Sequence, residues 1–184
     1  MMETIGNILM IGGNARKSGK TTLICRLLEA FGNQYKIAAI KVALYDDAGD
    51  FGEHHPQALP AGYQEVRETD PTVVKDSGKY LASGASESWF FAALPQSEKR
   101  VTDQIREISK RADLVILESN TLRKKIKPGR FVLVNHPGRD TKKSARELAS
   151  LVDYTLDTGS FEFTNVHQFI GIEDKSWSLK KLTR

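Results

Sequence analysis

A short loop near the start of the chain joins an apolar segment to an amphipathic one, and this junction constrains the fold more than any other feature. The apolar run covers residues 5–11 and stops at Gly12-Gly13, as a buried parallel strand entering a turn does. Helical periodicity begins at Thr21 and ends near Gly32. A strand, a glycine-containing loop and a helix in this order are typical of the carboxyl edge of a parallel α/β sheet.

The loop carries most of a phosphate-binding motif, whose pattern is Gly-x-x-x-x-Gly-Lys-Ser/Thr. Its second half, Gly19-Lys20-Thr21, matches, whereas Asn14 stands at the first glycine position and Gly13 lies one residue earlier. Gly19 has no Cβ, so the main chain can approach phosphate oxygens, and its amide adds to the positive end of the following helix. Lys20 brings a charge to the phosphates, and the Thr21 hydroxyl can ligate Mg²⁺. The residues expected to bind a nucleoside triphosphate are Gly13, Asn14, Arg16, Lys17, Ser18, Gly19, Lys20, Thr21 and Thr22.

Two further charged residues end predicted strands on the same edge of the sheet. Glu118 closes the apolar run 113–118, where a carboxylate can hold Mg²⁺ or position a water molecule. Lys41 closes the strand predicted over residues 36–42, and its ammonium group can reach a terminal phosphate or an anionic substrate. The alternative for both is a solvated charge at a strand end. The expected catalytic residues are Lys20, Glu118 and Lys41, and the expected metal ligands are Thr21 and Glu118.

Three other polar positions leave alternatives open. Asn135 follows a predicted strand, and its amide could read the edge of a nucleobase or belong to a turn before His136. Asp76 could cap a helix or face the terminal phosphate. His54 and His55 could help to ligate a transition metal, or could belong to a polar loop.

Strand and helix patterns alternate along the rest of the chain, which indicates a three-layer α/β/α fold with a mostly parallel central sheet. The 184 residues fit a single domain, 1–184, with a long irregular loop over about 43–75 and a weakly patterned tail from about residue 160. Ser144 and Glu147 have the spacing of a capping box. Further strands are expected over 87–94, 131–134 and 152–156, and helices over 76–82, 97–111 and 144–151.

Composition narrows the cellular setting and the partners. The 27 Lys and Arg residues exceed the 23 Asp and Glu residues only slightly, which does not favour a nucleic-acid partner. The single cysteine, Cys25, excludes an intramolecular disulfide and fits a reducing compartment. No apolar run approaches the ~20 residues that span a bilayer, and the first residues lack the basic region of a signal peptide. We expect a soluble, cytoplasmic protein without a membrane partner.

Four segments together resemble molybdopterin-guanine dinucleotide biosynthesis protein B (MobB) and its relatives in the wider class of P-loop NTPases that includes dethiobiotin synthetase. They are the loop over residues 12–22, the Ala-Ala-Ile-Lys sequence at 38–41, the Lys-Asp-Ser-Gly-Lys-Tyr-Leu-Ala-Ser-Gly-Ala sequence at 75–85, and the strand at 113–118. The phosphate loop by itself is specific for nucleotide binding, and the 75–85 block points towards MobB. Order and rough spacing agree over about residues 5–135.

The resemblance implies a P-loop NTPase fold, binding of GTP or ATP with Mg²⁺, and often a homodimer. For a MobB-like protein it further implies weak hydrolysis and a role as an adapter that assists molybdenum cofactor assembly through a protein partner. An alternative within the wider class is an ATP-dependent kinase or ligase of the dethiobiotin synthetase type, with Lys41 and the 43–75 loop holding a small acid. A nucleotide sensor without hydrolysis is a third interpretation. No Asn-Lys-x-Asp guanine signature is present in the sequence, so the base stays open.

Overall fold

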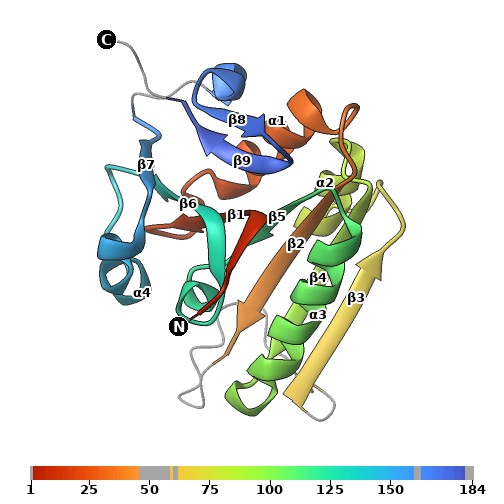
Figure 1. The fold of residues 1–184 in the computed structure, drawn as a ribbon. Helices are drawn as coiled ribbons and strands as arrows, with labels where there is room; N and C mark the ends of the chain where they lie inside the picture. Colours follow the sequence, from red (N-terminus) through yellow and green to blue (C-terminus); the bar gives the residue numbers. More distant parts are fainter. Residues whose placement is uncertain (1, 46–58, 60–61, 160–162, 181–184) are drawn as a thin grey trace.

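The central element is a seven-stranded sheet with the spatial order β3-β4-β2-β5-β1-β6-β7 (Figure 1). The computed structural model describes residues 2–45, 59, 62–159 and 163–180. Neighbouring strands of this sheet are parallel except at its edge, where β3 runs antiparallel to β4. In chain order the strands are β1 (Thr4–Gly13), β2 (Ile37–Leu44), β3 (Tyr63–Glu68), β4 (Glu87–Ala93), β5 (Leu114–Glu118), β6 (Lys127–Asn135) and β7 (Tyr154–Asp157).

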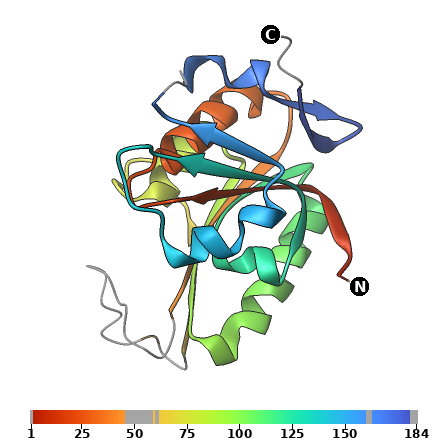
Figure 2. The same cartoon turned by 90° about the vertical axis from the view of Figure 1, so that its left-hand side faces the viewer.

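Helices cover both faces of the sheet, and a separate hairpin joins one of these layers (Figures 1 and 2). The hairpin consists of β8 (Ile170–Glu173) and β9 (Ser176–Leu179). The α-helices are α1 (Lys20–Phe31), α2 (Asp76–Ala82), α3 (Glu98–Arg111) and α4 (Lys143–Glu147). The short 3-10 helices are η2 (Pro95–Ser97), η3 (Thr121–Lys124), η4 (Ala149–Leu151) and η5 (Phe163–Gln168).

Alternating residues of the central strands divide the core into two halves. Ile8 and Met10 of β1 pack on the side that holds α3 and α4, whereas Leu9 and Ile11 pack on the side that holds α1, α2 and the β8–β9 hairpin. Such alternation follows from the two-residue period of a strand, which sends successive side chains to opposite faces. The prediction of a three-layer α/β fold with a mostly parallel sheet is confirmed.

The register of the parallel strands brings three carboxyl ends together. Lys41 of β2 and Ile11 of β1 both stand opposite Glu118 of β5, which lies between them. On the other side of β1, Gly13 stands opposite Val134 of β6. The phosphate loop therefore leaves the middle of the sheet, where parallel α/β sheets place their ligands.

The stretch expected to be irregular contains an edge strand, which is a correction to the prediction. β3 lies at positions 63–68, inside the 43–75 region. Tyr63 is its only buried residue, and exposed polar residues follow it. Neither face of β3 is buried along its length, so the strand has no apolar alternation and the sequence pattern missed it.

The predicted capping box is wrong, and the helix that it was expected to start is interrupted. α4 ends at Glu147, and η4 follows as a separate turn. Neither Ser144 nor another described side chain caps α4, whose N-cap residue is Lys142. Glu147 accepts a hydrogen bond from Lys124 at 2.5 Å instead, so its carboxylate is directed to η3.

The weakly patterned tail contains η5 and the β8–β9 hairpin. Trp177 of β9 is buried, and its indole N–H donates to the carbonyl of Val115 in β5 at 3.1 Å. None of the helices that the structure describes is long and apolar enough to cross a membrane.

Candidate nucleotide site

The phosphate loop wraps from the end of β1 to the first turn of α1. Gly19 immediately precedes the helix with φ of 103°, a left-handed conformation that glycine adopts without strain. No acidic side chain lies in the first turn of α1, and none of the described side chains caps it. The partial positive charge at this helix end is therefore available to an anion.

The interior of the loop forms a cradle with no room for a side chain at Gly13. A Cβ at Gly13 would lie 2.4 Å from the Ser18 hydroxyl oxygen and 3.0 Å from the Lys20 ammonium nitrogen. The Ser18 hydroxyl is buried and has no hydrogen-bond partner among the described residues. Lys20 donates to the carbonyl of Ala15 at 3.4 Å, so its ammonium group lies inside the loop. The unpartnered Ser18 hydroxyl and the Lys20 ammonium group thus lie close together against Gly13, and both can donate hydrogen bonds to a phosphate group.

Four charged side chains meet beside this cradle. Glu118 lies 3.9 Å from the Lys20 nitrogen through Oε1, and 3.8 Å from the Lys41 nitrogen through Oε2. Lys41 also forms an ion pair with Asp76, the first residue of α2. Thr21 lies close enough to Asp76 to help lower the pKa of Asp76. The structure thus brings the side chains of Lys20, Glu118 and Lys41 together with that of Asp76; the N-cap residue of α2 is Lys75, so Asp76 does not cap this helix.

Burial and charge shift the pKa values of these groups in different directions. Burial lowers the pKa of Lys20, an effect that Glu118 opposes and the neighbouring Lys142 reinforces. Burial also disfavours the charged form of Lys41, but Glu118 and Asp76 outweigh it and raise the pKa of Lys41. For Asp76, burial is outweighed by Lys41, Lys79 and Thr21, so the pKa of Asp76 is lowered.

Glu118 is held by a residue that the sequence analysis did not single out. The Tyr80 hydroxyl donates to Glu118 Oε2 at 2.5 Å, and Tyr80 is fully buried. Burial and the charge of Glu118 raise the pKa of Tyr80 well above its usual value, so the phenol is the proton donor. The helical pattern of residues 76–82 could have shown that Tyr80 lies one turn after Asp76 on the same face.

Two asparagine side chains hold the main chain of the loop in place through hydrogen bonds. Asn120, just after β5, accepts from the Gly13 amide at 2.8 Å and donates to the Gly13 carbonyl at 2.9 Å. Asn14 is buried, and its side chain bonds both the amide and the carbonyl of His136. The main-chain amide of Asn14 donates to the carbonyl of Val134. Asn14 thus ties the loop to the end of β6, and a phosphate contact from its side chain stays a prediction.

The remaining loop residues and Asn135 are arranged around this centre. Arg16 and Lys17 are exposed on the loop, whereas Thr21 is half-buried at the start of α1. Asn135 lies at the end of β6, where its amide is 3.5 Å from a carboxylate oxygen of Asp157 in β7. His54 and His55 lie outside the described residues. Within the part of the chain that the structure describes, no group of three or more His, Cys, Asp and Glu side chains could hold a metal ion by itself.

A pocket of about 240 Å³ opens on the cradle, between the ends of β2 and β5 and the start of α4. Phosphate-loop residues and Glu118 form one wall, Val42, Ala43 and Leu44 form an apolar wall, and Thr121, Lys142 and Ser144 add polar groups. Because Lys142 lies close enough to lower the pKa of Lys20, two cations share this pocket. The pocket is therefore suited to anions.

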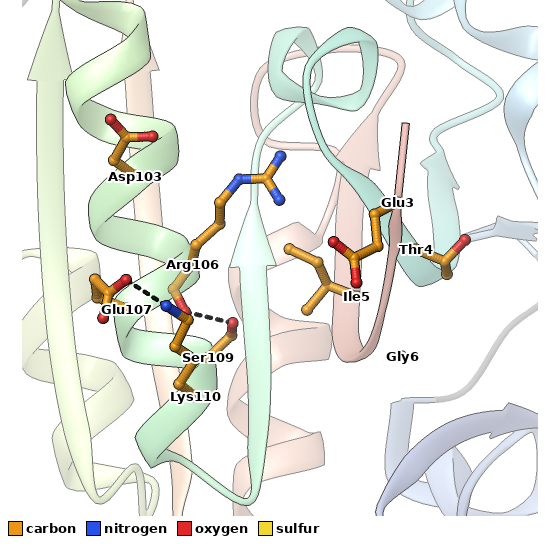
Figure 3. Close-up of a pocket in the computed structure, with 9 residues that line it drawn as sticks. All are labelled: Glu3, Thr4, Ile5, Gly6, Asp103, Arg106, Glu107, Ser109 and Lys110. Carbon is orange, nitrogen blue, oxygen red and sulfur yellow. Dashed lines mark hydrogen bonds and ion pairs between the residues drawn. The ribbon is translucent and has the colours of Figure 1, made fainter. Parts of the chain in front are cut away.

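A larger pocket of about 520 Å³ lies at the other end of the sheet, between the start of β1 and α3 (Figure 3). Its charged groups are of both signs, and some already pair with each other: Lys110 donates to Glu107 at 2.6 Å. It lies away from the carboxyl ends of the parallel strands, and no phosphate-loop residue lines it. The pocket beside Lys20 is therefore the candidate site.

The central β1 strand, the phosphate loop and helix α1 define an α/β fold of the P-loop type. No known family and no curated protein matches the sequence. Among solved structures, the chain is similar to the kinase domain of the Escherichia coli tyrosine kinase ETK, at 18% identity and a TM-score of 0.44. That match covers 88% of this chain and 72% of the other. A likeness at this level does not bear on function.

Proposed function

We propose that the chain is a nucleoside triphosphate-binding protein that acts with Mg²⁺ and hydrolyses the bound nucleotide slowly. The observation that carries this proposal is the pair of donors in the loop: a buried, unpartnered Ser18 hydroxyl and the Lys20 ammonium group lie close together against Gly13. Main-chain amides at the start of α1 add further donors. Together they provide the positive, hydrogen-bonding environment that a polyphosphate requires.

The chain's own residues divide the work in this proposal. Lys20 and the loop amides would neutralise the phosphates, and Lys41 would contact the terminal phosphate once its pairing with Asp76 and Glu118 loosens. Thr21 and Glu118 would hold Mg²⁺, with Asp76 close to Thr21; a hydroxyl and carboxylates are suitable oxygen ligands for this ion. When bound, Mg²⁺ would supply charge neutralisation at the phosphates, which phosphoryl transfer needs more than covalent catalysis.

The finer assignment is a MobB-like adapter, and it rests on the segment resemblance. In this interpretation residues 1–184 form one nucleotide-binding domain in the cytoplasm, the nucleotide is GTP or ATP, and Asn135 contacts the base. The bound state would control a protein partner in molybdenum cofactor assembly, with the chain acting as a homodimer. Weak hydrolysis would then limit how long the nucleotide-bound state lasts.

A second candidate is an ATP-dependent kinase or ligase that acts on a small acid. The pocket beside Lys20 favours it, because the wall formed by Val42, Ala43 and Leu44 and the Lys142 side extend beyond the phosphate loop. An acid there would lie next to the terminal phosphate. The two candidates differ in whether a small molecule stimulates turnover.

Phosphate release separates the candidates. ATP and GTP are each supplied at saturation, with Mg²⁺ or with EDTA, and then with a panel of small mono- and dicarboxylic acids. Slow, Mg²⁺-dependent release that no acid changes supports the adapter; stimulation of about tenfold or more supports the kinase or ligase. A wild-type rate in a Lys20→Ala variant would refute both.

A further inference from the structure

Tyr80 is a buried tyrosine whose only polar side-chain atom is directed at the candidate site. The residue is fully buried in the core half that contains α1 and α2, and its hydroxyl donates to Glu118 Oε2 at 2.5 Å. Phenylalanine would fill the same apolar space equally well. Packing alone therefore does not explain a tyrosine at this position, whereas the hydrogen bond of its hydroxyl to Glu118 does.

The hydrogen bond distinguishes the two oxygens of Glu118. Oε2 accepts from Tyr80 and lies 3.8 Å from the Lys41 nitrogen, whereas Oε1 lies 3.9 Å from Lys20 on the side of the phosphate loop. A carboxylate fixed at one oxygen cannot rotate freely about its terminal bond. Oε1 is thereby directed towards the space next to the loop.

Tyr80 and Asp76 share one face of α2, four residues apart. Asp76 holds Lys41 while Tyr80 holds Glu118, so one short helix places both charged strand ends. At Gly78 a Cβ would lie 2.1 Å from the Val73 carbonyl oxygen, so this glycine lets α2 pack closely against the segment that leads into it. A rigidly seated helix can fix the geometry of the groups that it holds.

We propose that Tyr80 is a positioning residue, which fixes the Glu118 carboxylate through Oε2 so that Oε1 is directed to the metal or water beside the terminal phosphate. Because this role is defined relative to triphosphate hydrolysis, it rests on the proposed function. Residues that orient a ligand from behind commonly change metal affinity or activity by about 10–100-fold when they are altered.

The primary test is Tyr80→Phe in the full chain, with Tyr63→Phe as the matched control. Tyr63 also donates to a glutamate, Glu65, at 2.6 Å, but on the edge strand β3 and away from the loop. In Tyr80→Phe we expect an about tenfold lower rate of phosphate release and a higher Mg²⁺ requirement, with triphosphate affinity in EDTA within about twofold of wild type. Tyr63→Phe should match the wild type in all three. Unchanged rate and Mg²⁺ requirement in Tyr80→Phe would overturn the proposal.

A double-mutant cycle with Glu118→Gln separates positioning from a general loss of structure. If Tyr80 acts through Glu118, Tyr80→Phe should cost less than about twofold in the Glu118→Gln background. An undiminished tenfold loss in that background would show that Tyr80 acts elsewhere. Unfolding of the chain by Tyr80→Phe but not by Glu118→Gln would likewise overturn the positioning role.

A measurement on the nucleotide-free chain tests the role of Tyr80 separately from the proposed function. The side-chain carboxyl carbon of Glu118 can be followed by NMR at neutral pH, assigned by its loss in Glu118→Gln. We expect its resonance to move in Tyr80→Phe and to stay in Tyr63→Phe. If the resonance moves but the wild type binds no triphosphate, Tyr80 still positions Glu118 and the nucleotide function is refuted. If the resonance does not move and the wild type binds triphosphate normally, the nucleotide function stands and the positioning role of Tyr80 is refuted.

Discussion

Gly19 carries a main-chain conformation on which the whole phosphate loop depends. Its φ of 103° is rare for residues with a side chain, and a Cβ would lie 2.9 Å from the ring of Phe163. We expect Gly19→Ala to destabilise the fold by about 1–3 kcal/mol, because strain and crowding act together. Urea denaturation measures this loss. Gly138→Ala is the control, since a Cβ there meets nothing closer than 3.5 Å; equal stability of both variants would contradict the account.

The ion pair between Lys41 and Asp76 gives the molecule a defined pH window of stability. The pKa of Asp76 is lowered below 3.8, so its contribution is present above that value and is lost as the pH falls through the lowered pKa. The pKa of Lys41 is raised above 10.5, so its contribution is present below that value and is lost as the pH rises through the raised pKa. The pair therefore stabilises the fold fully between pH 3.8 and pH 10.5, and its contribution is lost only beyond these limits.

Asp76→Asn tests this window. We expect the variant to be less stable than the wild type by about 1–2 kcal/mol at neutral pH, and the difference to shrink in acid as Asp76 becomes protonated. Denaturant melts between pH 2 and pH 7, a range set by the usual carboxylate pKa values, measure it. Asp103→Asn, which breaks an exposed pair with Lys99, should show little difference throughout. A pH-independent gap between Asp76→Asn and the wild type would count against the ion pair as its cause.

Sequence patterns singled out candidate residues that stand in a motif or at a strand end, and did not single out a residue whose contact depends on the fold. Lys20 and Thr21 stand inside a motif, and Glu118 and Lys41 end apolar runs, so each could be singled out. Tyr80 was not singled out, because its hydroxyl contacts Glu118, which lies 38 positions away in the sequence. No local pattern encodes such a partner, because it is set by strand order.

Among the elements, the β8–β9 hairpin shows how a weakly patterned segment becomes ordered. Trp177 of β9 packs edge-on against Phe31 of α1 with ring centroids 6.0 Å apart, and its N–H bonds Val115. Tertiary burial of one side chain, rather than periodicity along the hairpin, fixes its place. The edge strand β3 was not predicted because mostly exposed residues follow Tyr63, whereas α2 was predicted at its observed limits, 76–82.

Trp177→Phe should therefore destabilise the chain by about 1–3 kcal/mol, through a lost hydrogen bond and an incompletely filled site. Chemical denaturation followed by circular dichroism measures this effect. Trp89→Phe is the matched control, because Trp89 also uses its N–H, for Glu87, but is only partly buried. Should Trp89→Phe cost as much as Trp177→Phe, the hairpin would not be anchored as described.

For the molecule as a whole, strand order matters more than any single contact. The order β2-β5-β1-β6 puts the loop between the acid and lysine on one side and Asn135 on the other. Alternating strands and helices in the sequence predicted the layers but not this order, since many orders satisfy the same pattern. This order gathers the carboxyl ends of the inner strands into a single candidate site, in which a polyphosphate would lie between Lys20 and the start of α1.

Calorimetric titration of ATP and of GTP, each with Mg²⁺, into the wild-type chain tests this claim most directly. We expect saturable heat for at least one nucleotide, and an affinity lower by about 100-fold or more in Lys20→Ala, because the phosphates lose a partly buried cationic partner. Lys124→Ala, which alters an exposed ion pair with Glu147, should bind as the wild type does. No heat from either nucleotide, or full affinity in Lys20→Ala, would contradict the account.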